Sequence, residues 1–220
     1  MNEEKIGYLR LNQIFGDLNE KELQELDRMT AMTTCERGRV FYAPEETGEV
    51  LFLLKRGRVQ IYRLSTEGKK FVITTLESGT VFGEMALVGQ GMYSTFAESV
   101  EPCTLCALSR RDVEMILAKY PRVAIRLLES VGRRLTDAEE RLEDIAFKSI
   151  PARLASLLLK IQKDKFIDGE THQTLAEMIG TYRETITQTL NEFKSQGLIG
   201  IQRKRIEILD SDRLAQLAEQ

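Results

Sequence analysis

Residues 172–199, HQTLAEMIGTYRETITQTLNEFKSQGLI, constrain the fold more than any other segment of the chain. Apolar residues recur there at helical spacing in two groups, Leu175, Ala176 and Ile179 and then Ile186, Leu190 and Phe193. Gly180 stands between the two groups, where a tight turn between helices favours a residue without a side chain. The small Ala176 allows the two helices to approach closely. The segment therefore predicts two packed helices joined by a short turn.

The second helix of this pair exposes polar side chains at its N-terminal end. Arginine can donate two hydrogen bonds to guanine, glutamate can accept one from N4 of cytosine, and glutamine can pair with adenine. We therefore expect Arg183, Glu184 and Gln188 to read DNA bases. The alternative is a helix pair that serves packing alone.

Residues 198–209, LIGIQRKRIEIL, alternate in polarity on either side of a basic tip, which predicts a two-stranded wing beside the second helix. A solvated hairpin tip is the simpler interpretation, but basic side chains beside a recognition helix are well placed for phosphates. Backbone contacts to DNA are expected from Thr181, Thr185, Arg203, Lys204 and Arg205.

The N-terminal part of the chain has a different pattern. Between residues 37 and 109, short apolar runs alternate with turn signals, and glycines recur at the expected corners. This pattern predicts an antiparallel β-roll of the jelly-roll type, with a helix in residues 18–30 covering one end. We assign residues 1–120 to this domain.

Residues 121–147 predict one long helix. Its apolar positions are spaced by three and four residues: Leu128, Val131, Leu135, Ala138, Leu142 and Ile145. A repeat of 3.5 residues is typical of a two-stranded coiled coil, so we expect a homodimer through this helix. Packing of the helix on its own β-roll is the alternative. Residues 148–220 then form a second domain, which opens with a helix behind Pro151.

The segments FGEMAL and YRETITQTL, together with the long helix and the wing, resemble the cyclic-AMP receptor and fumarate–nitrate regulator family of bacterial transcription factors. The resemblance covers about residues 10–210. It implies an α+β fold with a cyclic-nucleotide-binding-like β-roll, a dimerisation helix and a winged helix-turn-helix. It also implies a homodimer on double-stranded DNA with a pseudo-palindromic TGTGA-like site, and activation through RNA polymerase, with residues 164–171 placed like the activating loop.

The family's DNA-reading pattern is incomplete here. Arg183, Glu184 and Thr185 match it, whereas Gln188 stands where the family has a basic residue. We therefore expect a base preference at this position that tolerates adenine. His172 and Gln173 stand at the start of the first helix, where the resemblance implies side chains that contact the DNA backbone. A solvated residue at the helix start is the alternative for His172.

The resemblance also identifies an effector pocket. Its residues are Phe82, Gly83, Glu84, Ala86, Leu87, Tyr93 and Ser94 from the β-roll, and Leu135, Ala138 and Glu139 from the long helix. In cyclic-nucleotide-binding relatives, the glutamate holds the ribose and an arginine opposes the cyclic phosphate. Tyr93 stands at the place of that arginine, and Ala138 and Glu139 replace the hydroxyl pair that reads adenine.

A phenol cannot supply the charge and the two-pronged geometry of a guanidinium. We therefore expect a degenerate pocket that does not bind cyclic AMP, in which FGE has a structural role. Two alternatives stay open. The protein can be a ligand-gated factor with an effector between β-roll and helix, or the β-roll can be a regulatory module of an enzyme, which leaves the helix pair and its wing unexplained.

The composition of the chain bears on other classes of protein: metal-binding, enzymatic and membrane proteins. The chain has one histidine, His172, and three cysteines, and its net charge is −3. The cysteines are Cys35, Cys103 and Cys106. We expect Cys103 and Cys106 to be core thiols, because they would face opposite sides of a strand, and a redox role of these two thiols is the alternative. We expect no metal, no cofactor, no enzymatic activity and no membrane segment, and we expect the protein in the cytoplasm.

Overall fold

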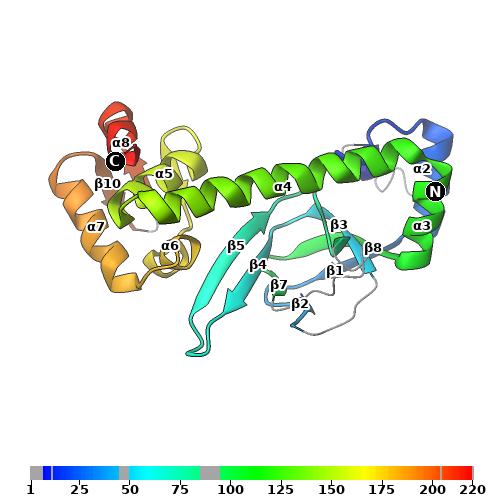
Figure 1. Ribbon diagram of the computed structural model, residues 1–220, viewed down its shortest axis with the longest axis horizontal. Helices are drawn as coiled ribbons and strands as arrows, with labels where there is room; N and C mark the ends of the chain where they lie inside the picture. The colour runs from blue at the N-terminus through cyan, green and yellow to red at the C-terminus, as the bar shows by residue number, and fades with distance from the viewer. Residues whose placement is uncertain (1–6, 11, 45–49, 85–94, 204, 220) are drawn as a thin grey trace. The chain divides into compact units, whose positions relative to one another are not determined.

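The computed structural model describes residues 7–10, 12–44, 50–84, 95–203 and 205–219 (Figure 1). The chain divides into two units, of which the first comprises Met1–Leu64 and Ile73–Leu135 and the second Ser65–Val72 and Thr136–Gln220.

Two four-stranded sheets make up the N-terminal β-roll. One has the order β1–β8–β3–β6, with β1 Ala31–Cys35, β8 Cys103–Ser109, β3 Val50–Arg56 and β6 Val81–Phe82. The other has the order β2–β7–β4–β5, with β2 Val40–Tyr42, β7 Phe96–Ser99, β4 Val59–Leu64 and β5 Lys70–Leu76. The pairs β1–β8, β3–β8 and β4–β7 are antiparallel, as the recurring turn signals predicted.

Strand β8 is buried on both faces because each face meets a different core. Cys103 and Leu105 join a cluster with Leu54, Phe82 and Ala97 inside the roll. Cys106 and Leu108 belong to a second cluster, formed with the helices of this unit. The structure thus confirms that Cys103 and Cys106 lie on opposite faces of their strand.

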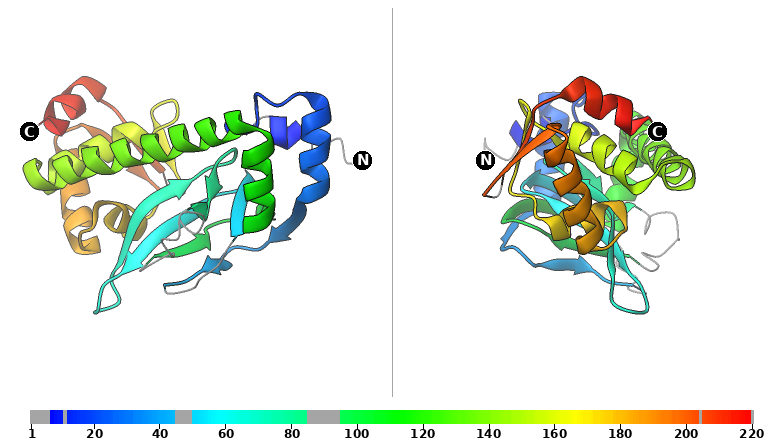
Figure 2. Two further views of the ribbon diagram at one scale, coloured as in Figure 1. Left: turned by 45° about the vertical axis from the view of Figure 1, so that its right-hand side comes forward. Right: turned by 90° about the vertical axis from the view of Figure 1, so that its left-hand side faces the viewer.

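Helices α2 (Glu20–Met29) and α3 (Arg110–Lys119) lie side by side on the outer face of the first sheet (Figure 2). Both begin with capping boxes, formed by Asn19 with Glu22 and by Ser109 with Asp112. Lys119 donates a hydrogen bond to Glu25 and so links the two helices.

Helix α4 follows as one continuous helix, Pro121–Phe147. Its predicted seam is largely exposed in the single chain: the exposed fraction is 71% at Leu128, 60% at Leu135 and 68% at Leu142. A stripe of leucines left in water is unfavourable. The seam therefore lacks an intrachain cover in the part of the chain that the structure describes.

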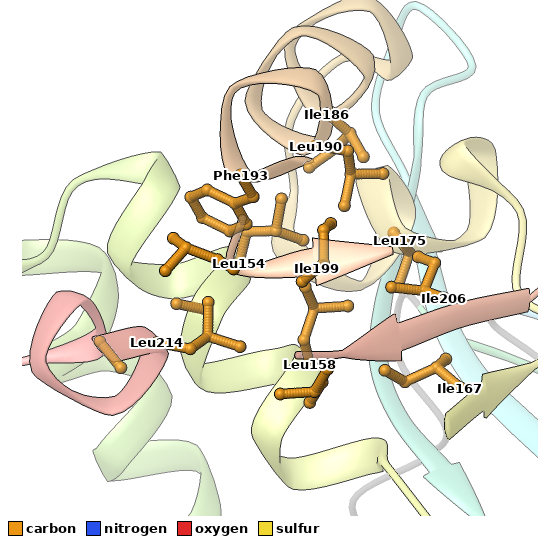
Figure 3. Packing of buried hydrophobic residues seen from close by; sticks show 14 of the residues in the cluster. Leu154, Leu158, Ile167, Leu175, Ile186, Leu190, Phe193, Ile199, Ile206 and Leu214 are labelled. Atoms are coloured by element: carbon orange, nitrogen blue, oxygen red, sulfur yellow. The ribbon is translucent and has the colours of Figure 1, made fainter. Parts of the chain in front are cut away.

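The second unit joins four further helices to a three-stranded sheet. The helices are α5 (Ile150–Ile161), α6 (His172–Ile179), α7 (Arg183–Ser195) and α8 (Ser211–Ala218), and the sheet has the order β10 (Ile199–Gln202), β11 (Arg205–Ile208), β9 (Phe166–Asp168). Helix α5 has Ser149 as its N-cap and Pro151 in its first turn. All of these elements contribute to one core, in which Leu154, Leu190 and Leu214 are fully buried (Figure 3). The predicted α+β fold of β-roll, long helix and winged helix-turn-helix is confirmed.

Candidate nucleic-acid interface and effector pocket

The turn between α6 and α7 is built around Gly180. Helix α6 starts at the N-cap Thr171, whose hydroxyl accepts a hydrogen bond from the backbone amide of Thr174. It ends at Gly180, which has a φ of +79° and donates its N–H to the carbonyl of Ala176. The amide of Thr181 donates to the same carbonyl. The left-handed conformation redirects the chain within two residues, so that α7 begins at Arg183.

The inner face of α7 is held by the core. Ile186 and Leu190 are fully buried, and Leu175 and Ala176 of α6 belong to the same cluster (Figure 3). The side chain of Thr189 is also buried and donates to the carbonyl of Thr185. Because this face is fixed, the opposite face of α7 has a defined orientation on the surface of the unit.

That opposite face is a shallow depression lined by α7 alone. Its residues are Arg183, Glu184, Thr187, Gln188, Asn191, Glu192 and Ser195. Sequence reasoning identified the first, second and fourth of these and missed the rest. The missed ones follow Glu184, Gln188 and Asn191 by three or four residues, a helical spacing that would have identified them. The DNA major groove is wide enough to admit an α-helix that presents such a polar face.

Side chains on this face already contact one another. The amide nitrogen of Gln188 donates to Glu192 at 3.1 Å, which orders both side chains along one turn. A ring nitrogen of His172 lies 2.9 Å from the hydroxyl of Thr187. His172 therefore connects the start of α6 with the middle of α7.

The other predicted backbone contacts on the helix pair differ in exposure. Thr181 is buried, Thr185 is half-buried, and Gln173 is exposed and donates to Glu177 at 2.9 Å. Gln173 and His172 both lie in the first turn of α6, where unpaired backbone N–H groups favour an anion such as phosphate.

The wing is the hairpin of β10 and β11. Arg203 is exposed in its turn, and Lys204 lies outside the described residues. The guanidinium of Arg205 donates two hydrogen bonds to Asp168, at 2.6 and 3.1 Å, and lies over the ring of Phe166. The Asp168 carboxylate raises the pKa of Arg205. Arg205 thus links β11 to β9.

Part of the predicted effector pocket lies in the first unit. Phe82 is buried, and its ring stacks on that of Phe52 with centroids 4.9 Å apart. Glu84 accepts a hydrogen bond from Arg134 of α4 at 2.7 Å, and Arg134 also donates to the carbonyl of Val81. The side chain of Glu84 is 13% exposed and that of Arg134 is 27% exposed. Sequence reasoning did not identify Arg134.

The second carboxylate oxygen of Glu84, Oε2, is buried and has no hydrogen-bond partner among the described residues. Tyr42 lies near this carboxylate, and burial together with the charge of Glu84 raises its pKa to about 12, although a hydrogen bond with Thr95 opposes the shift. Tyr42 therefore stays a neutral phenol at physiological pH.

The remaining predicted pocket residues fall into two groups. Ala86, Leu87, Tyr93 and Ser94 lie outside the described residues. Leu135, Ala138 and Glu139 lie on exposed positions of α4. Of the ten predicted pocket residues, the structure thus brings Phe82, Gly83 and Glu84 together.

The described residues show neither a metal site nor a membrane-spanning helix. They contain no group of three or more histidine, cysteine, aspartate or glutamate side chains that could hold a metal ion. No helix within the described ranges is both long enough and apolar enough to span a membrane.

The sequence matches two family profiles. One is described as a cyclic nucleotide-binding domain and matches residues 32–120. The other is a Crp-like helix-turn-helix domain and matches residues 152–217. The matches fall on the β-roll and on the unit that carries α6, α7 and the wing.

Curated relatives and solved structures match over most of the chain. A CRP-like cAMP-activated global transcriptional regulator of Mycobacterium tuberculosis is 26% identical, with 93% of this chain and 96% of the relative covered. The cyclic AMP receptor protein of Thermus thermophilus is 29% identical, with 83% and 85% covered. A Crp/Fnr-family regulator from Eubacterium rectale has a crystal structure that superposes with a TM-score of 0.78 at 25% identity, covering 96% of this chain and 100% of that one. The chain therefore belongs to the CRP/FNR family of DNA-binding transcriptional regulators.

Proposed function

We propose that the protein binds a pseudo-palindromic, TGTGA-like operator as a homodimer and acts mainly as an activator, without a need for cyclic AMP. The observation that carries the DNA part is the polar outer face of α7, oriented by a fully buried inner face. In a helix-turn-helix dimer, the second helix of each copy enters the major groove of one half-site.

On this face, Arg183 donates to guanine and Glu184 accepts from cytosine. Gln188 lies one turn further along α7. Its side-chain amide donates to Glu192 in the structure and can donate to a base edge instead when DNA is bound. This position then favours adenine or discriminates weakly. Thr187 and Asn191 extend the same surface and reach the flanking base pairs or their phosphates.

Phosphate contacts surround this surface. Arg203 and Lys204 approach the backbone from the wing, and His172, Gln173 and Thr185 approach it from the helix pair. Thr181 contributes through its position at the start of α7, because its side chain is buried. Arg205 is assigned to the backbone as well, but its pair with Asp168 makes it the weakest of these contacts.

The homodimer forms through α4. Its seam of leucines at heptad spacing is exposed in the single chain, and a second copy of the same helix would bury it. Two recognition helices related by a two-fold axis then match a palindromic site. Regulation occurs in the cytoplasm, and the segment 164–171 contacts RNA polymerase.

The effector pocket is degenerate toward cyclic AMP. Tyr93 brings no positive charge, and Arg134, the described cation beside FGE, already pairs with Glu84. A cyclic phosphate placed there would lose its hydration without a free guanidinium to replace it. The cost is about a hundredfold or more in affinity.

A second candidate function is a ligand-gated factor. The buried and unpaired Oε2 of Glu84 can accept a hydrogen bond from a hydroxyl group of an effector, and the relatives from Mycobacterium tuberculosis and Thermus thermophilus are named for cyclic AMP. Such an effector would have to bind without a positively charged side chain at position 93 to pair with a phosphate group.

Operator binding of the ligand-free protein tests the proposal. The full chain is titrated onto genomic promoter fragments, with and without cyclic AMP or cyclic GMP, and calorimetry records nucleotide binding in parallel. We expect specific binding without nucleotide and no heat of binding at micromolar nucleotide. Tyr93→Arg, which restores the charge, is expected to gain cyclic-AMP affinity. Micromolar binding to the unchanged protein that switches on DNA binding would support the ligand-gated candidate instead.

A further inference from the structure

Two of the three cysteines face each other across the pair of strands β1 and β8. Cys35 is the last residue of β1, and its antiparallel register partner is Cys103, the first residue of β8. Cys35 also packs against the cluster that contains Cys103, and its thiol is among the groups that raise the pKa of Cys103. Sequence reasoning missed this pair, because the residues are far apart in the chain and the CxxC spacing drew attention to Cys106 instead.

The backbone geometry suits a covalent link. Directly opposed residues of an antiparallel pair have Cα atoms about 4.5 to 5.5 Å apart, and disulfides span Cα separations of about 4.4 to 6.8 Å. Both thiols are free in the structure. The register therefore brings the two Cα atoms within the range that a disulfide spans.

The third cysteine is excluded as a partner. Cys106 faces the opposite side of β8, belongs to the cluster with α2 and α3, and is opposed in register by Met32. Among the described thiols, the pairing of Cys35 with Cys103 is thus determined by strand geometry.

The sulfur of Cys103 is also held in place. It donates toward the carbonyls of Glu101, at 3.2 Å, and Arg58, at 3.4 Å. Gly57, with a φ of +95°, lies so close that a Cβ there would be 2.6 Å from the sulfur. A glycine at this turn leaves the space that the buried thiol occupies next to Cys35.

Access to the pair is one-sided. Cys35 is half-buried at the end of β1, whereas Cys103 is 2% exposed. A reagent in solution therefore reaches Cys35 first, and Cys103 is positioned to react only with Cys35.

We propose that Cys35 and Cys103 form a reversible dithiol–disulfide pair, which small disulfides of the oxidised-glutathione type convert to an intrachain disulfide. In the first step, the Cys35 thiolate attacks one sulfur of the small disulfide, forms a mixed disulfide and releases one small thiolate. In the second step, the Cys103 thiolate attacks the sulfur of Cys35 and expels the second small thiolate. The two cysteines lose two protons and two electrons, and the small disulfide gains them as two thiols.

The environment of Cys103 sets the rate of this reaction. Burial, together with the neighbouring Cys35, raises the pKa of the Cys103 thiol to about 11. Little Cys103 thiolate is therefore present near neutral pH, and the second step accelerates as the pH rises. Under reducing conditions the pair rests as the dithiol, and oxidation requires sustained oxidant.

The expected consequence is a change in the stability of the first sheet. Strand β1 is an edge strand, because the sheet has the order β1–β8–β3–β6. Edge strands open more readily than central ones, and a crosslink to β8 restricts this opening. The disulfide also reduces the number of conformations available to the unfolded chain, which stabilises the folded state. We expect the oxidised protein to unfold at a higher temperature than the reduced protein.

Thiol counting and peptide mapping of the full-length protein test this proposal without any substitution. Oxidised glutathione is added, and free thiols, intact mass and disulfide-linked peptides are measured. We expect the free thiols to fall from three to one, the mass to decrease by two hydrogen atoms, and one linked pair of peptides, containing Cys35 and Cys103. Dithiothreitol should restore the original state.

Three variants sharpen the result. Cys35→Ser and Cys103→Ser should abolish both the crosslink and the rise in unfolding temperature, and Cys106→Ala should retain both. The oxidation rate of the unchanged protein should increase between neutral and alkaline pH. Three free thiols after oxidation, a stable glutathione adduct on Cys35, a link through Cys106, or a disulfide between two chains would each overturn the proposal.

Discussion

Glu84 of the FGE segment accepts a hydrogen bond from Arg134 of α4 at 2.7 Å, and both side chains are largely buried. This pair connects the end of β6 with the long helix inside the first unit. The pair supports the expectation that FGE has a structural role. The pair also places a positively charged side chain beside FGE, although residues 88–98, which follow FGE in the chain, contain no lysine or arginine.

Substitution of Arg134 should destabilise the first unit. Arg134→Ala leaves Glu84 charged, mostly buried and without its partner, and we expect a loss of about 1 to 3 kcal/mol in the free energy of unfolding. Urea denaturation measures this loss. Arg133→Ala changes an exposed neighbour and should cost less than about 0.5 kcal/mol. The double variant Glu84→Gln/Arg134→Ala should recover part of the loss, and an additive loss would argue against the pair.

Charge on the α4 seam should prevent dimer formation. Leu128→Arg and Leu135→Arg place cations at positions that are exposed in the single chain and that a second copy would bury. Sedimentation velocity should show a monomer for each variant and a dimer for the unchanged protein. Glu140→Arg, an exposed position outside the seam, serves as the control. A dimer that survives both leucine substitutions would place the interface elsewhere.

Sequence reasoning succeeded where a local pattern determines the structure. The periodicity of Leu175, Ile186 and Leu190 predicted the helix pair, and Pro151 marked the first turn of α5. It missed Arg134, the Arg205–Asp168 pair and the opposed Cys35 and Cys103. Each of these depends on strand register or on contacts between distant segments, which no local spacing encodes.

The turn at Gly180 should tolerate no side chain. Its φ of +79° is unfavourable for any residue with a Cβ, so Gly180→Ala should destabilise the second unit by about 1 to 2 kcal/mol. The matched control is Gly200→Ala in β10, which has ordinary backbone angles and only van der Waals contacts at 3.7 Å or more. Thermal unfolding compares the two. Equal midpoints would show that the turn can adopt another conformation.

Acid should weaken the attachment of the N-terminal segment to α3 and α4. Hydrogen bonds from Arg126 lower the pKa of Asp17, and those from Lys119 and Tyr120 lower the pKa of Glu25. The stability from these carboxylates is fully present above their ordinary pKa values of 3.8 and 4.5, and is lost as the pH falls through the lowered folded-state values.

Urea midpoints between pH 7 and pH 3 test this pH dependence. Asp17→Asn and Glu25→Gln should each give a shallower decline with falling pH than the unchanged protein, because the variant has no carboxylate to protonate at that site. Glu143→Gln, an exposed residue of α4, should leave the slope unchanged. Parallel curves for all four proteins would contradict the assignment of these groups.

Arg183 and Lys204 should affect DNA binding in different ways. Arg183 lies on the outer face of α7, and its guanidinium is expected to bind guanine. Arg183→Ala should lower affinity for the operator by about 1 to 3 kcal/mol and relax base preference at one position. Lys204→Ala should weaken binding to operator and random DNA alike and reduce the salt dependence by about one phosphate contact.

Fluorescence anisotropy on both DNAs at several salt concentrations separates these effects. Glu219→Ala, an exposed residue just after α8, is the matched control and should change neither affinity nor its salt dependence. If Arg183→Ala lowered affinity equally for operator and random DNA, Arg183 would contact phosphate. In that case, Glu184 and Gln188 would carry the base recognition, since they are the next exposed polar residues along the same face of α7.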